Sequence, residues 1–178
     1  MSTTSQISVI LVSHQSGSML PLLARRALSQ DGVAELLLLD NGNAPETLDA
    51  LRKLQSTDVR LKIISGHGNI GYAAACNRGV QAALCDTICL LQSDVFLDED
   101  TIPKLSAALA VSPKEALVAP MLLNADGSEQ KGGRMRFMNA RNALIEATKV
   151  YKLSRGFERI YQHLTPAPDG IAEVEAVG

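Results

Sequence analysis

The stretch Ile63–Asp94, IISGHGNIGYAAACNRGVQAALCDTICLLQSD, indicates the fold class of this chain more clearly than any other segment. Its pattern is typical of a strand, a glycine-rich turn, a helix and a second strand that ends on a carboxylate. Glycines 66, 68 and 71 carry no Cβ, so the turn can bend tightly and approach a ligand closely. The helix predicted over 71–84 points its free N–H groups at that turn, which favours an anion such as a phosphate. The stretch therefore predicts a phosphate cradle beside an acidic strand end.

The same alternation of strand and helix runs through the first two thirds of the chain. Apolar runs bounded by polar residues predict buried strands, and apolar residues spaced three or four apart predict helices. Four such alternations predict an α/β fold with a doubly wound, mainly parallel sheet and helices on both faces. The expected strands are 8–13, 35–39, 59–64 and 87–91, and the expected helices are 18–29, 45–55, 71–84 and 98–111. We also expect strands at 116–121 and 171–177, and a long helical pattern from 137 to about 164.

Polar residues gather where the predicted parallel strands end, which is the edge at which such sheets bind ligands. Asp94 follows the strand ICLL and faces the predicted phosphate cradle, so it is a credible ligand for Mg²⁺ or Mn²⁺ bound to a diphosphate. Asp40 ends another strand. Its carboxylate would either accept a hydrogen bond from a nucleoside or close an Asx-type turn with Asn41 and Gly42, and the residues alone leave both readings open. His14 and His67 lie near this edge, but no partner supports a functional role for either.

Composition narrows the class of protein. The 178 residues are 46% apolar and 20% charged, as in an ordinary soluble α/β protein, and the net charge of −2 argues against a nucleic-acid-binding surface. The three cysteines form no CxxC pair, which favours reduced core thiols over disulfides or zinc. The start of the chain has no basic leader and its apolar run is too short to span a membrane. We therefore expect a cytoplasmic protein.

A nicotinamide-dinucleotide domain is one alternative. The sequence from Gly66 to Gly71 spells GxGxxG between a predicted strand and a helix, and Asp94 lies where such a site places its ribose partner. Against this reading, the motif follows the third predicted strand, and the first strand ends in SHQSG without a glycine cradle. A non-catalytic nucleotide-binding module of the same fold is a further alternative.

Five segments together resemble the inverting family 2 glycosyltransferases of the GT-A fold, in particular the rhamnosyltransferase-type members that build bacterial polysaccharides. They are VILVSHQSG, LLLDNGN, GNIGYAAACNRGV, LLQSDVFLDED and NADGSEQ, which occur in the family's order and spacing over essentially the whole chain. The resemblance implies a nucleoside-diphosphate sugar as donor, UDP- or dTDP-linked, and Mg²⁺ or Mn²⁺ as cofactor. It also implies a saccharide or lipid-linked acceptor.

The resemblance also implies roles for individual residues. Ser13 and Asp40 would hold the nucleoside, and Asp94 would be the metal-binding last acid of the family's DxD-like element. Gln92 departs from that element, since many members have Asp or Asn at its position. The residues that would shape the sugar-phosphate side of the site are Asn69, Gly71, Asn77 and Arg78.

No catalytic residue is assigned to this chain. In similar proteins the strand corresponding to EVEAVG leads to a second half with the acceptor site and a Glu-Asp pair, whose Asp is the catalytic base. Asp169, Glu173 and Glu175 do not lie in the matching context. We therefore expect 1–130 to be the donor-binding domain and 131–178 to be an incomplete acceptor region, so that the chain binds a nucleotide sugar but turns over poorly.

The segment 131–159 is strongly basic, with eight basic residues against two acidic ones. A surface helix packed on its own domain is the simpler interpretation. The more specific interpretation is contact with an anionic membrane or a lipid-linked acceptor, which would make the protein peripheral to the membrane. The basic residues are Lys131, Arg134, Arg136, Arg141, Lys149, Lys152, Arg155 and Arg159.

Overall fold

Four parallel strands and four helices alternate along the first 111 residues, as the apolar pattern predicts. The computed structural model describes residues 6–112, 116–130, 134–135, 170–172 and 176–177. The chain divides into two units, 1–111 and 112–178, which we describe separately. In the first unit the strands are β1 (Ile7–Ser13), β2 (Val33–Asp40), β3 (Leu61–Ile64) and β4 (Thr87–Gln92). Its helices are α1 (Met19–Leu28), α2 (Pro45–Thr57), α3 (Tyr72–Ala82) and α4 (Thr101–Ala110).

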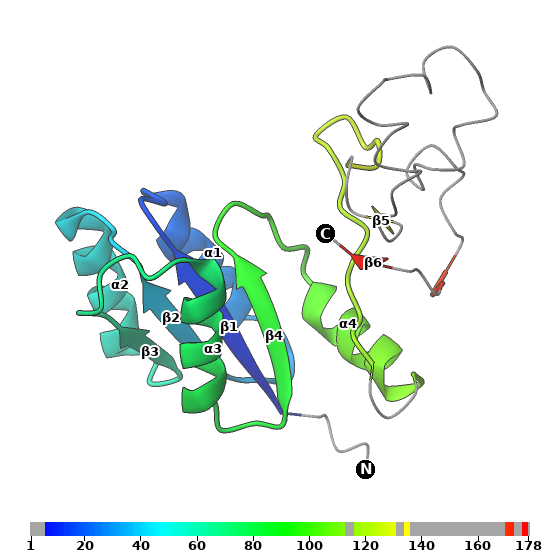
Figure 1. The fold of residues 1–178 in the computed structure, drawn as a ribbon, viewed down its shortest axis with the longest axis horizontal. Helices are drawn as coiled ribbons and strands as arrows, with labels where there is room; N and C mark the ends of the chain where they lie inside the picture. Colours follow the sequence, from blue (N-terminus) through cyan, green and yellow to red (C-terminus); the bar gives the residue numbers. More distant parts are fainter. Residues whose placement is uncertain (1–5, 113–115, 131–133, 136–169, 173–175, 178) are drawn as a thin grey trace, which may run out of the picture. The chain divides into compact units, whose positions relative to one another are not determined.

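The strands form one sheet in the order β3-β2-β1-β4, and every neighbouring pair is parallel. Figure 1 shows the four arrows side by side, with α1, α2 and α3 each connecting one strand of the sheet to the next. β1 and β2 are central and almost entirely buried, because both of their faces are covered. This arrangement confirms the expected doubly wound, mainly parallel α/β fold.

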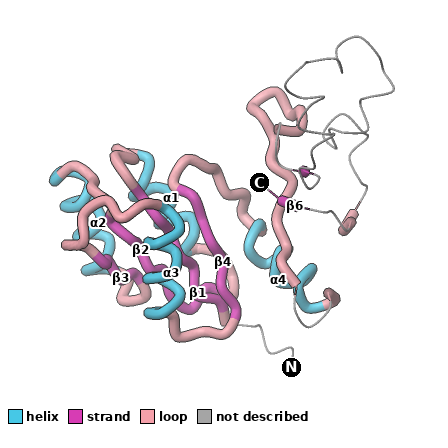
Figure 2. Tube along the Cα trace, in the orientation of Figure 1, coloured by secondary structure: helices cyan, strands magenta, loops and turns pink. Residues whose placement is uncertain are grey.

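Side chains from alternate positions of the central strands build two apolar layers. On one face Val9, Leu11, Leu36 and Leu38 pack with residues of α1, α2 and α4. On the other face Ile10, Val12, Leu37 and Leu39 pack with Ala75 and Cys76 of α3. Helices therefore cover both faces of the sheet, and Figure 2 shows α3 in front of the strands.

α3 approaches the sheet closely because Gly79 faces it. A Cβ at this position would lie 2.5 Å from Ile10 Cγ2 and 3.1 Å from Leu39 Cδ2, so no larger side chain fits without movement. The small residues of the helix thus let its backbone lie directly on β1 and β2. This packing fixes where the N-terminus of α3 emerges at the carboxyl edge of the sheet.

A buried carboxylate lies at the opposite, amino end of the sheet. Glu35 on β2 is 3% exposed. Its Oε1 accepts hydrogen bonds from Ser8 Oγ and from the backbone N–H of Leu84, both at 2.6 Å, and its Oε2 is 2.7 Å from Lys62 Nζ. The carboxylate therefore joins β1, β2 and β3 to the connection between α3 and β4. Every one of its described contacts is structural.

The second unit differs from the expectation at two places. Residues 116–121 form no strand in the described part of the unit, and Leu117 is 81% exposed. An apolar run becomes a strand only when a partner supplies its backbone hydrogen bonds, and Pro120 has no N–H to offer. Of the expected strand at 171–177, residues 171–172 form no strand, 173–175 lie outside the described residues, and 176–177 form β6 (Ala176–Val177), antiparallel to β5 (Arg134–Met135). The long helical pattern and most of the basic segment lie outside the described residues.

Candidate functional site

The parallel register brings the predicted site residues to one edge of the sheet. Ser13 at the end of β1 is the neighbour of Asp40 at the end of β2, and Val12 is the neighbour of Gln92 at the end of β4. The glycine turn follows β3 at the same edge, because Ile64 pairs with Leu39. Segments up to 80 residues apart in sequence therefore end together, as the strand pattern predicts.

Asp40 closes a turn with one of its two carboxylate oxygens. Its Oδ1 accepts hydrogen bonds from the backbone N–H of Gly42 at 3.1 Å, the backbone N–H of Asn43 at 2.9 Å and Asn43 Nδ2 at 2.8 Å. Asp40 is 7% exposed, and its Oδ2 receives no hydrogen bond from the described residues. The Asx-type turn is therefore present, and it occupies one of the two carboxylate oxygens.

Ser13 lies behind this turn. Its side chain is 1% exposed; the hydroxyl accepts a hydrogen bond from Asn43 Nδ2 at 2.8 Å and lies 3.4 Å from the carbonyl oxygen of Leu39. Asn43 also accepts a hydrogen bond from the backbone N–H of Ser16 at 3.1 Å. Ser13 thus supports Asp40 through Asn43, and sequence reasoning missed Asn43. The repeated asparagine in DNGN, directly after a buried strand, was the signal available for it.

The glycine turn has the geometry that its composition predicts. Gly66, Gly68 and Gly71 have φ angles of 87°, 64° and 81°, which favour glycine over any residue with a Cβ. Asn69 Oδ1 accepts a hydrogen bond from the backbone N–H of Gly71 at 3.0 Å. No side chain caps α3, so its first N–H groups have no capping acceptor. The turn therefore presents the N-terminus of α3 at the edge of the sheet.

Asn77 and Arg78 lie further along α3 on its exposed side, away from the buried face formed by Ala75, Cys76 and Gly79. Arg78 makes no ion pair with any described residue. Tyr72 begins the helix, and burial together with the adjacent Cys76 thiol raises its pKa to about 12. The phenol is therefore neutral at physiological pH and does not repel an anion at the start of α3.

Asp94 follows β4 as an exposed side chain. The residue before it, Ser93, is tied to the first loop, because Ser16 Oγ donates to Ser93 Oγ at 2.8 Å. The described residues contain no group of three or more His, Cys, Asp or Glu side chains arranged to hold a metal. A single carboxylate such as that of Asp94 could hold Mg²⁺ or Mn²⁺ only where phosphate oxygens and water completed the coordination.

Asn41 connects the strand end to the glycine turn, whereas the sequence placed it only in an Asx-type turn after Asp40. Its side chain contacts both His67 and Gly71, while its backbone carbonyl contacts His14. The two histidines, for which the sequence offered no partner, therefore share one. Only the folded chain brings these segments together.

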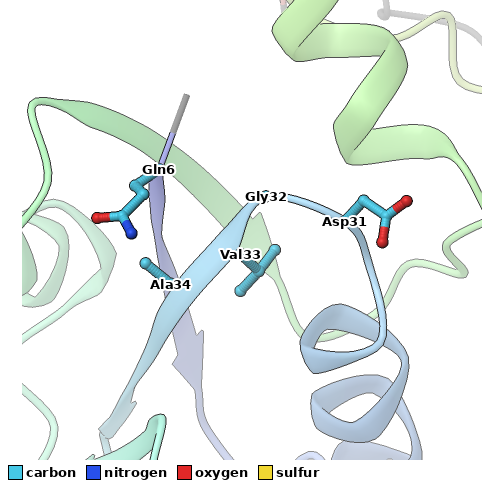
Figure 3. A pocket seen from close by; sticks show the side chains of 5 residues that line it. All are labelled: Gln6, Asp31, Gly32, Val33 and Ala34. Carbon is cyan, nitrogen blue, oxygen red and sulfur yellow. The ribbon is translucent and has the colours of Figure 1, made fainter. Parts of the chain in front are cut away.

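A cavity of about 330 Å³ lies at the other end of the strands (Figure 3). Among the described residues, Gln6 and Asp31 supply its charged or long polar side chains, and its other lining residues are Gly32, Val33 and Ala34. It belongs to the amino ends of β1 and β2 and shares no residue with the edge described above. Its lining offers no phosphate cradle.

No described helix is both long enough and apolar enough to cross a membrane.

Comparison with known proteins identifies related chains. A 70-residue segment is 34% identical to an uncharacterized glycosyltransferase from Haemophilus influenzae, covering 39% of this chain and 28% of that protein. In structure the chain resembles a mannosyltransferase from Pyrobaculum calidifontis in complex with GDP-Man and Mn²⁺, with a TM-score of 0.53 at 19% identity. That likeness covers 59% of this chain and 32% of the other, and it supports the GT-A fold. The chain thus spans about a third or less of both proteins.

The model of the family described as glycosyl transferase family 2 matches residues 8–169. The match includes β1 to β4, the glycine turn and the residues that follow β4, so it contains the whole edge built by Asp40, Gly71 and Asp94. The chain therefore belongs to glycosyl transferase family 2, whose members transfer sugars.

Proposed function

We propose that this chain is the donor-binding half of a glycosyltransferase that takes its sugar from a nucleoside diphosphate. The observation that carries the proposal is the shared edge: the carboxylate of Asp40, whose Oδ2 receives no hydrogen bond from the described residues, and the uncapped N-terminus of α3 both lie there. A nucleoside needs hydrogen-bond acceptors and donors, whereas a diphosphate needs N–H groups and positive charge. The edge offers the two kinds of contact side by side.

In this proposal Asp40 accepts a hydrogen bond from the nucleoside through Oδ2, and Ser13 holds Asp40 in place through Asn43. Gly71 and Asn69 shape the turn on the sugar-phosphate side. Asn77 and Arg78 extend that side along α3, where the guanidinium of Arg78, which makes no ion pair with a described residue, supplies a positive charge. UDP or dTDP is the carrier we expect, and rhamnose is the sugar suggested by the sequence resemblance.

Asp94 is the proposed ligand of a divalent cation, Mg²⁺ or Mn²⁺. The ion would neutralise the charge that develops on the departing nucleoside diphosphate. A protein of similar fold has been solved with a nucleotide sugar and Mn²⁺ together, which supports this combination. The side chain of Asp94 is exposed and has no described partner that would compete with a metal.

The reaction we propose is an inverting single displacement, in which an acceptor hydroxyl attacks the sugar as the nucleoside diphosphate leaves. A carboxylate must remove the hydroxyl proton. None of the described acids at the edge is assigned to that step, so we expect the isolated chain to bind donor and to transfer sugar poorly. The acceptor, a saccharide or a lipid-linked saccharide of a polysaccharide pathway, and membrane contact through 131–159 are parts of the same proposal.

The test is a thermal shift with UDP, dTDP, GDP and NAD, each with and without Mn²⁺. A ligand at ~100-fold excess over its Kd stabilises the folded state by ~2.7 kcal/mol, a readily measured shift. We expect a nucleoside diphosphate to raise the Tm only with metal, and Asp94→Ala to abolish that increase. Asp86→Ala is the matched control, because Asp86 is also exposed and flanks β4 at its other end.

Two results would contradict the proposal. A shift with NAD alone would make the glycine turn a dinucleotide cradle. An equal Tm increase with and without Mn²⁺, unchanged in Asp94→Ala, would show that binding requires no metal. It would favour a non-catalytic nucleotide-binding module.

A further inference from the structure

We infer that Asn41 is a positioning residue that holds the phosphate side of the donor site in register with the nucleoside side. The inference rests on the proposed function and deepens it. It concerns how one site binds two chemically different parts of a ligand.

Asn41 is only 3% exposed, and each of its polar groups has a hydrogen-bond partner. Its backbone N–H donates to the carbonyl oxygen of Ser13 at 2.9 Å, and its carbonyl oxygen accepts from His14 Nδ1 at 2.9 Å. Its side-chain Nδ2 donates to the carbonyl oxygen of Gly71 at 3.2 Å. Its Oδ1 lies 3.1 Å from His67 Nε2. The backbone thus belongs to the nucleoside side, and the side chain reaches across to the glycine turn.

The chemistry of these contacts requires an amide at this position. A carbonyl oxygen only accepts, so Nδ2 must face Gly71 and Oδ1 must face His67. His67 then donates to this oxygen through Nε2–H. Its Nδ1 is buried and has no partner among the described residues. Aspartate would lose the donor to Gly71, and leucine would lose both bonds.

The contact with Gly71 acts at the start of α3. The Gly71 carbonyl that accepts from Asn41 also accepts from the N–H of Ala75 at 3.2 Å, the first turn of the helix. Asn41 therefore holds the turn at two points, His67 and Gly71, both of which precede the uncapped N–H groups of α3. Asp40 does not depend on this side chain, because its own bonds come from Gly42 and Asn43.

This separation predicts a selective effect. Without the amide of Asn41, the turn and the N-terminus of α3 lose their fixed position relative to Asp40, so the diphosphate binds less well. The nucleoside contact is retained. Loss of one well-placed hydrogen bond of this kind corresponds to about tenfold in affinity.

The experiment compares wild type with Asn41→Leu, which keeps the size of the side chain. Calorimetry gives the Kd of the nucleoside diphosphate that stabilises wild type, with Mn²⁺, and of the matching nucleoside. We expect the Kd of the diphosphate to rise by about tenfold or more and that of the nucleoside to change by less than about threefold.

Gln30→Leu is the matched control. Gln30 is 2% exposed, and its amide also uses both ends, with Nε2 donating to the Asp98 carbonyl and Oε1 accepting from the N–H of Ile102 at the start of α4. It precedes β2, at the amino end of the sheet. General loosening of the fold would affect binding in both variants, whereas the positioning role is specific to Asn41.

A second pair of variants tests the same role should Asn41→Leu fold poorly. Gln at position 67 can place an amide N–H where His67 Nε2–H lies, so His67→Gln should bind the diphosphate like wild type. His67→Leu cannot donate and should weaken the diphosphate alone. Failure of wild type to bind any nucleoside diphosphate would overturn the proposed function itself. Two other results would overturn only the role of Asn41. In one, wild type binds the diphosphate and Asn41→Leu weakens binding of the diphosphate and the nucleoside equally. In the other, Gln30→Leu also weakens binding of the diphosphate more than that of the nucleoside.

Discussion

Replacing Glu35 by glutamine should destabilise the fold substantially, although the change keeps the number of heavy atoms and leaves the site edge intact. Gln can retain Oε1 as the acceptor for Ser8 and Leu84, which both contact that oxygen at 2.6 Å. Its new Nε2 then faces Lys62 Nζ, where two donors meet instead of a charged pair at 2.7 Å. The substitution therefore removes one bond and the charge that strengthens the other two.

The magnitude follows from these contacts. A hydrogen bond to a charged group contributes about 1.5–3 kcal/mol, and neutral acceptors make bonds roughly half as strong as charged ones. Breaking a fully buried ion pair costs about 3–5 kcal/mol, but the Lys62 side chain is 44% exposed and can turn to water. We expect a loss of about 2–3 kcal/mol, which corresponds to a Tm lower by roughly 4–12 °C for a chain of this length.

The effect should depend on pH. Burial raises the pKa of Glu35, but the bonds from Lys62, Ser8 and Leu84 outweigh burial and leave the pKa below its ordinary value of 4.5. A carboxylate whose pKa is lower in the folded than in the unfolded state stabilises the protein above the unfolded pKa, and this contribution disappears as the pH falls through the folded pKa. The stability difference between wild type and Glu35→Gln should therefore be complete at neutral pH and shrink below pH 4.5.

Urea denaturation followed by circular dichroism at several pH values measures both quantities. Glu99→Gln is the matched control, because Glu99 is 87% exposed and lies 3.6 Å from Arg26. The control should change the free energy of unfolding by less than about 0.5 kcal/mol. A Glu35→Gln variant as stable as wild type at pH 7, or a difference that persists unchanged at acid pH, would refute the reasoning.

Two further predictions concern α3 and β4. Gly79→Ala should lower the free energy of unfolding by about 1–3 kcal/mol, since its Cβ would overlap Ile10; a urea midpoint equal to or above that of wild type would contradict the close packing of α3. Burial raises the pKa of the Cys89 thiol from 9.0 to about 11. Iodoacetamide at pH 8 should therefore label Cys89 about a hundredfold more slowly in the native than in the unfolded protein. Mass spectrometry measures both rates, and similar rates would show that the thiol is not buried as described.

Much of the fold could be predicted from local patterns. The expected helix over 71–84 is observed as Tyr72–Ala82, and the expected strand over 87–91 as Thr87–Gln92. Such elements follow from apolar periodicity and glycine positions, which are properties of short segments. The strand predicted at 116–121 is not observed, because an apolar run forms a strand only where a neighbouring strand can hydrogen-bond to its backbone.

The candidate site was predicted less completely. Asp40 and Gly71 could be assigned to one edge, since parallel strands end together. The side-chain contacts of Asn41 and Asn43 could not be predicted, because their partners come from other strands and loops. Ser13 was expected to hold the nucleoside, and its direct contact with a ligand stays a prediction; its observed bonds support Asp40 instead.

The sequence by itself determined the succession of strands and helices along the chain, the glycine turn before α3 and the edge at which the polar residues gather. These features depend on periodicity and backbone freedom, which neighbouring residues specify. Only the tertiary structure decided which polar groups meet: Asn41 with His67 and Gly71, and Glu35 with Lys62. A hydrogen bond acts over about 3 Å, so its partners are defined by the fold and not by their distance along the chain.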